Sequence, residues 1–184
     1  FPYPVTFAVD ATLEDAETRM RAFRDEGFEV LAMVDLPEGA DARDAETTFG
    51  SALARVPEAV GVLEGISGGF QGSRATSDQV AEILADTGHG LVTQDKGLNT
   101  MPKLARKQGV PARSIFRDFD SKGQSPTVIR RFLDGAAFKA RQEGGVIMLG
   151  RLRPDTISAL LLWGLQDRAS KVSLAPVSAV LQQE

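Results

Sequence analysis

Short apolar runs alternate along this chain with longer stretches in which apolar residues recur every three or four positions. The runs that predict strands are residues 5–9, 30–34, 59–63, 90–93, 114–116, 146–149 and 172–177. The stretches between most of them have the period of an amphipathic helix. Strands that alternate with helices form parallel sheets with right-handed crossovers, so the pattern predicts an α/β protein.

Three helices carry clear start or stop signals. The first is expected at 12–26, with Thr12 as its N-cap and Gly27 as its stop. The second is expected at 125–143, with Ser125 as N-cap and a proline in its first turn. The third is expected at 154–168, where a proline again opens an apolar helical face.

The number of strands leaves two architectures open, an open doubly wound sheet and an incomplete barrel. A dinucleotide-binding sheet would show G-x-G-x-x-G after a strand, and a P-loop would show GK followed by Ser or Thr. Neither pattern occurs, and the glycine-rich stretch at 64–74 predicts a loop across the mouth of the fold. We therefore expect one domain over residues 1–184, a distorted, incomplete (β/α) barrel of about seven mostly parallel strands.

Charge and composition exclude several classes of function. The formal net charge is −4 and no Lys/Arg cluster stands out, so nucleic acid is not an expected partner. With no cysteine and one histidine, the chain lacks thiolate or His-rich metal sites. No apolar run reaches the ~20 residues that span a bilayer, and no signal peptide is present. The chain begins inside an expected strand, which suggests that upstream sequence has been removed.

Polar residues follow most of the predicted strands. In β/α folds the functional groups gather at the carboxyl ends of the strands, although solvent exposure alone also places polar residues there. These ends hold Asp10, Asp35, Glu64, Asp95 with Lys96, Arg117 with Asp118, Arg151 with Arg153, and Ser178. The pattern predicts a cleft at this rim, but it names no reaction.

Five stretches, in order along nearly the whole chain, resemble motifs of the divergent polysaccharide deacetylase family. GFEVLAMVDLP (27–37) is similar to the family's G-H-E-V-L-L-H-L-P strand, and GSRATSDQ (72–79) is similar to the end of its N-H-M-G-S-R-F-T loop. LVTQDKGLNT (91–100) resembles a strand that ends in aspartate. GRLRPDTISAL (150–160) resembles G-H-P-x-P-E-T, and LAPVSAV (174–180) resembles V-P-V-S-A-L.

The resemblance implies a distorted β/α barrel, a family strand upstream of Phe1, and a periplasmic protein, tethered to the inner membrane only through an anchor outside this chain. Relatives of the NodB type remove N-acetyl groups from glycans with a divalent metal that polarises the amide and activates water. Here the family's four motif histidines fall on Phe28, Met33, Phe70 and Arg151. Phenyl and thioether groups do not hold a hard cation and a guanidinium repels one, so we expect no metal or other cofactor. His89 is expected at the opposite, stability-related end of its strand.

Two hypotheses follow from this comparison. In the first, the domain is a pseudoenzyme that binds an envelope polysaccharide or a protein partner. In the alternative, it is an active hydrolase or N-deacetylase with a reorganised carboxylate site. The candidate catalytic residues are Asp95, Asp35 and Asp10. The candidate substrate-binding residues are Arg74, Ser73, Asp95, Lys96, Arg151 and Phe70, because arginine binds anions, hydroxyls bind sugars, and Phe70 lies in the glycine-rich loop where a ring could stack.

Overall fold

The computed structural model describes residues 1–166 and 169–183. Contacts divide the chain into two compact bodies. The N-terminal body comprises Thr6–Ser114, and the C-terminal body comprises residues 1–5 with the described part of 115–184. Each body is described by itself below.

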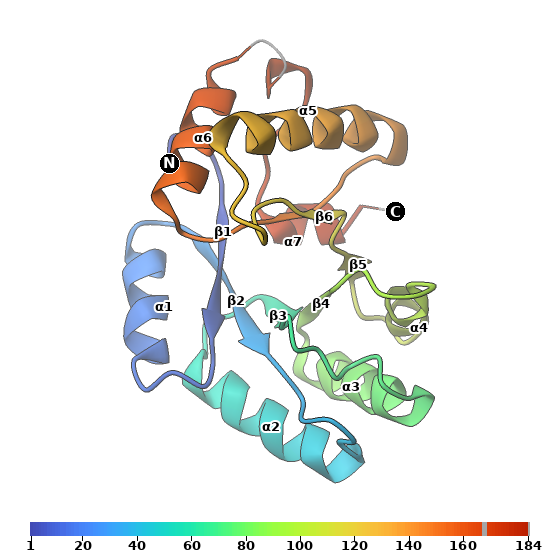
Figure 1. The fold of residues 1–184 in the computed structure, drawn as a ribbon. Helices are drawn as coiled ribbons and strands as arrows, with labels where there is room; N and C mark the ends of the chain where they lie inside the picture. The colour runs from blue at the N-terminus through green and yellow to red at the C-terminus, as the bar shows by residue number, and fades with distance from the viewer. Residues whose placement is uncertain (167–168, 184) are drawn as a thin grey trace. The chain divides into compact units, whose positions relative to one another are not determined.

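The N-terminal body is a five-stranded parallel sheet in the order β1-β2-β3-β4-β5, with helices between successive strands (Figure 1). Its strands are β1 (Thr6–Asp10), β2 (Glu29–Val34), β3 (Gly61–Glu64), β4 (Gly90–Thr93) and β5 (Ala112–Ser114). Its helices are α1 (Ala16–Asp25), α2 (Ala42–Arg55), α3 (Arg74–Thr87) and α4 (Thr100–Lys107). The alternation confirms the predicted α/β class.

The two central strands, β3 and β4, are buried at every residue. Such continuous burial is typical of parallel strands that are covered on both faces. Both strands begin with glycine, and a Cβ on Gly61 would lie 2.7 Å from the carbonyl oxygen of Gly90. Helices α2 and α3 pack on each other, as do α3 and α4. This rigid sheet fixes the strand ends from which the site is built.

Capping residues define both ends of helix α3, which begins at the last residue of the Gly72-Ser73-Arg74 stretch. The Ser73 side chain accepts a hydrogen bond from the Thr76 amide, and Gly88 ends the helix in a left-handed conformation with φ of 78°. A Ser N-cap and a Gly C-terminal residue are the usual pair at helix ends. Helix α3 therefore starts at Arg74, directly after the β3–α3 loop (residues 65–73).

The C-terminal body contains a second parallel pair of strands and the longest helix of the described chain. Its elements are β6 (Arg117–Asp118), α5 (Pro126–Glu143), β7 (Met148–Leu149), α6 (Pro154–Gly164), the 3-10 helix η1 (Ala169–Lys171) and α7 (Val177–Leu181). As predicted, Ser125 caps α5, its side chain accepting a hydrogen bond from the Val128 amide. The buried core of this body includes Phe119, Ile129 and Trp163.

Four details of the sequence-based prediction were wrong. The N-cap of α1 is Asp15 and not Thr12. Of the run at 114–116 only Ser114 is in a strand, as the last residue of β5, and the run at 172–177 forms no strand. Helix α6 ends at Gly164, and the last residues predicted for it, 167 and 168, lie outside the described residues. All described strands nevertheless pair in parallel, which is consistent with an incomplete (β/α) barrel.

Candidate functional site

Glu64, at the end of β3, is a fully buried carboxylate that organises the strand ends of the N-terminal body. Its Oε1 accepts hydrogen bonds from the Gln71 side chain (2.8 Å) and the Gln94 backbone amide (3.0 Å). Its Oε2 accepts one from the Phe70 backbone amide (3.1 Å). A buried charge is stable only when such donors satisfy it. Glu64 therefore ties the loop after β3 to the segment after β4.

Asp35, which follows β2, holds the other side of the β3–α3 loop. Its Oδ1 accepts a hydrogen bond from the Gly68 amide at 2.8 Å. A Cβ on Gly65 would lie 2.3 Å from the same oxygen, so this close approach requires glycine. The carboxylate that follows β2 is thus solvent-exposed, but it already holds the loop through a hydrogen bond within the chain.

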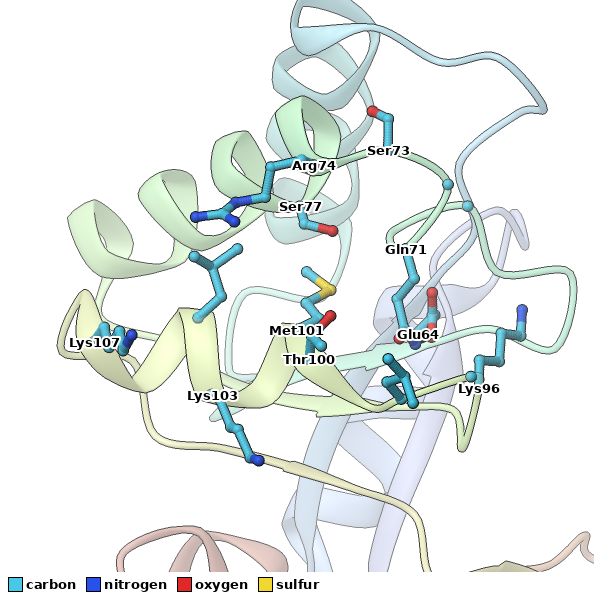
Figure 2. A pocket seen from close by; sticks show the side chains of 15 residues that line it. Glu64, Gln71, Ser73, Arg74, Ser77, Lys96, Thr100, Met101, Lys103 and Lys107 are labelled. Atoms are coloured by element: carbon cyan, nitrogen blue, oxygen red, sulfur yellow. Dashed lines mark hydrogen bonds between the residues drawn. The ribbon is translucent and has the colours of Figure 1, made fainter.

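A pocket of about 800 Å³ opens beside this loop, between the start of α3 and helix α4 (Figure 2). Its polar and charged lining residues are Glu64, Gln71, Ser73, Arg74, Ser77, Lys96, Thr100, Lys103 and Lys107. Leu98, Met101 and Leu104 supply the apolar part. The pocket therefore lies at the carboxyl ends of β3 and β4, as ligand sites of parallel sheets do.

Three of the predicted binding residues, Ser73, Arg74 and Lys96, line this pocket. Arg74 is largely exposed and pairs with Asp78 at 3.3 Å, four residues along the same helix. Lys96 reaches over the β3–α3 loop, since a Cβ on Gly68 would lie 2.2 Å from the Lys96 amine. These side chains come from two loops and a helix start that are distant in sequence.

Asp10 and Asp95 are outside the residues that line the pocket. The Asp10 carboxylate accepts hydrogen bonds from the amide and hydroxyl of Thr12 at 2.9 and 2.7 Å. Asp95 is exposed, and its Oδ1 accepts a hydrogen bond from the Asn99 side chain at 2.5 Å. Both carboxylates thus brace the turns in which they lie.

Phe70 is fully buried, with its ring centroid 5.2 Å from that of Phe49. The ring is part of the core and presents no face on which a sugar could stack. Only the backbone of Phe70 serves the site, through its amide bond to Glu64 and its carbonyl, which accepts a hydrogen bond from Ser77 at 2.8 Å. Sequence could not reveal this, because the glycines around Phe70 suggested an exposed loop.

Arg151 lies in the C-terminal body and is bound within it by two carboxylates. Its guanidinium donates to both oxygens of Asp118 (2.8 and 2.9 Å) and to Asp120 (2.6 Å). The hydrogen bonds to Asp118 outweigh partial burial and raise the pKa of the Arg151 guanidinium above its ordinary value. The candidate role of Arg151 in substrate binding, together with Arg74 and Asp95, stays a prediction.

Asp120 is the functional-looking residue that sequence reasoning missed. It is fully buried and accepts hydrogen bonds from the Arg151 amide (2.7 Å) and the Thr156 hydroxyl (2.6 Å). Burial alone would raise the pKa of this carboxyl, but the hydrogen bonds from Thr156 and Arg151 lower it below the ordinary value. An aspartate two residues beyond a strand-end Asp, in RDFD, was the signal available.

The positions of the family's motif histidines do not fit a metal. Phe28 packs edge-on against Phe7 at 5.1 Å, Met33 lies within β2, and Phe70 and Arg151 are held as described. In the described part of the chain, no three His, Asp or Glu side chains are grouped so that they could hold a metal ion. His89 precedes β4 and contacts the Thr87 hydroxyl at 2.8 Å, and burial lowers its pKa.

Comparison with known families agrees with this fold. The divergent polysaccharide deacetylase family matches residues 1–181, so the chain belongs to that family. An uncharacterized protein, ATU2773 from Agrobacterium tumefaciens C58, has a similar crystal structure: the TM-score is 0.86 at 19% identity, covering 96% of this chain and 78% of that one. At that identity the likeness shows the fold alone. No curated protein matches the sequence. Residues 1–166 and 169–183 include no helix long and apolar enough to cross a bilayer.

Proposed function

We propose that this protein is a carbohydrate-binding member of its family, which binds a glycan of the cell envelope in the pocket beside α4 and does not deacetylate it through a metal. The observation that carries the proposal is the pocket itself. It opens at the carboxyl ends of β3 and β4 and combines hydroxyl, amide and cationic side chains with apolar ones. Sugar-binding sites need this mixture, because a sugar ring has hydroxyls at its edge and apolar C–H groups on its faces.

The state of the carboxylates argues against a hydrolytic site here. General acid–base catalysis requires a carboxylate that can exchange a proton with the substrate. The Glu64 carboxylate already accepts from three donors, and Asp35 already accepts from the Gly68 amide. These carboxylates act as positioning residues that shape the pocket. The alternative, an active hydrolase with a reorganised carboxylate site, would require one of them to leave its partners.

Binding is tested by two-dimensional NMR of the labelled protein during titration with a panel of neutral and acidic oligosaccharides. We expect shifts concentrated in backbone amides of the pocket, at 69–74 and 97–101, with α1 (Ala16–Asp25) as the internal control because it does not line the pocket. If no member of the panel shifts these amides, or if the shifts fall in α1, the binding proposal is refuted.

Catalysis is tested separately by measuring acetate release from an N-acetylglucosamine oligomer with added zinc, cobalt or nickel. We expect no release above the metal-only background and no stoichiometric metal after dialysis. Metal-dependent acetate release whose rate is proportional to protein concentration and saturates with substrate would refute the non-catalytic part and favour the hydrolase alternative. Because binding and release are measured independently, each half of the proposal can fail alone.

A further inference from the structure

The pocket beside α4 has a charge opposite to that of the chain as a whole. The chain has a formal net charge of −4, yet four cations, Arg74, Lys96, Lys103 and Lys107, line this pocket. Its one acidic lining residue, Glu64, is fully buried and bonded to three donors, so it offers little charge to a ligand. An anion entering the pocket would therefore meet a local excess of positive charge.

These cations are poorly neutralised by the protein. Within the described part of the chain, none of the lysines of the pocket has a carboxylate within ion-pair distance. Arg74 pairs with Asp78, but 78% of its side chain is exposed and the closest approach is 3.3 Å. Lys103 and Lys107 are four apart on α4, a spacing at which like charges repel and destabilise a helix. A bound anion would relieve that repulsion.

The distribution of the cations favours a chain of negative groups over a single one. Figure 2 shows Arg74 at the start of α3, Lys103 and Lys107 along α4, and Lys96 at the other side of the pocket. They are spread over these segments and do not converge on one point, as the donors of a phosphate site would. Successive charges along an extended ligand would each meet one of them.

Apolar residues that line the pocket alternate in sequence with the lysines. Leu98 is 90% exposed at the pocket, and Leu104 and Met101 line it further along α4. An exposed leucine of this size offers a surface for the C–H face of a sugar ring, which polyphosphate lacks. Resting on the proposed glycan-binding function, we infer that the ligand is an acidic polysaccharide, with carboxylate groups on successive sugars that meet Lys96, Arg74, Lys103 and Lys107.

The experiment is calorimetric titration of the protein with an oligogalacturonate, a chito-oligosaccharide of equal length and a short polyphosphate. We expect the oligogalacturonate to bind at least about tenfold more tightly than the neutral oligosaccharide, and its affinity to fall as salt is raised from about 50 to about 300 mM. The Lys103→Gln/Lys107→Gln variant should weaken oligogalacturonate binding about fivefold to tenfold and should weaken binding of the neutral sugar by a clearly smaller factor. Both lysines are exposed, so the variant should fold normally.

The matched control is Arg19→Gln/Arg43→Gln, which removes the same charge from exposed positions of the same body outside the pocket. It should retain oligogalacturonate affinity. Equal losses in the two variants would show a non-specific charge effect and overturn the inference, and so would polyphosphate binding as tightly as the acidic sugar. If the neutral oligosaccharide binds as well as the acidic one, the inference fails while the proposed function stands. If no oligosaccharide binds, both fail.

Discussion

Replacing Asp120 with asparagine removes the central charge of the network in the C-terminal body. Asp120 Oδ2 accepts from the Arg151 amide and the Thr156 hydroxyl, and Oδ1 accepts from the Arg151 guanidinium. Every neighbour on both oxygens is thus a donor. An asparagine must turn its own NH₂ group toward at least one of them, so no orientation of the amide preserves the network.

The expected cost follows from burial. Removing one partner of a buried ion pair costs about 3–5 kcal/mol when it leaves the other charge uncompensated. Arg151 keeps its bidentate bond to Asp118 and its side chain is 33% exposed, so part of that penalty is avoided. We therefore expect Asp120→Asn to lower the free energy of unfolding by about 2–4 kcal/mol. Asp118→Asn, at a more exposed position, should cost only about 1 kcal/mol.

The assay is urea denaturation followed by tryptophan fluorescence. Trp163 is the single tryptophan and lies in the core of the same body, so its signal reports this network. Because the native pKa of Asp120 lies below its unfolded value, the wild-type protein should lose this stabilisation as pH falls from the unfolded pKa through the native pKa, and the Asp120→Asn variant should not. If Asp120→Asn costs no more than Asp118→Asn, or if both proteins respond equally to acid, the assignment of the charge to Asp120 is refuted.

Three further perturbations test other parts of the structure. Phe70→Ala should lower the free energy of unfolding by about 3–5 kcal/mol, because it leaves a cavity in the core beside Phe49. A thermal melt checks this, since loss of an exposed ring would leave the melting temperature nearly unchanged. Tyr3 is the sole tyrosine, and burial raises its pKa to about 12. Absorbance titration of the folded protein should show a midpoint near that value, and the free energy of unfolding should fall as pH rises toward it. A midpoint near 10 would contradict the burial of Tyr3. Gly65→Ala should place a methyl group against the Asp35 carboxylate and so speed hydrogen exchange of the Gly68 amide, which donates to that carboxylate. An unchanged exchange rate would refute the close approach of Gly65 and Asp35.

The strand–helix alternation could be predicted because each element buries one strong apolar pattern. The runs at 30–34 and 90–93 match β2 and β4, and the expected helix at 125–143 matches α5 almost residue for residue. The predicted ends of helices and strands were wrong where tertiary contacts determine them. Thr12 is not the N-cap of α1, because its hydroxyl donates a hydrogen bond to the Asp10 carboxylate. That bond holds Thr12 in a tight turn that precedes the helix.

The candidate site was predictable only in part. Ser73, Arg74 and Lys96 follow from the strand-end rule and the motif, and all line the pocket. Lys103 and Lys107 were missed, although their spacing of four on a helix after a strand end was visible in the sequence. Whether a strand-end carboxylate faces a ligand or its own backbone cannot be read from residue order. That choice depends on donors contributed by distant segments.

The packing of Phe70 on Phe49 has a consequence for any substitution at this position. The sequence resemblance places a histidine of the family motif at position 70, and Phe70→His would introduce that residue type here. The new histidine would not be able to bind a ligand, because the side chain at this position points into an apolar core, where an imidazole would lose its hydration without gaining a partner. A polar functional group at position 70 would therefore require the loop and the aromatic core behind it to change together.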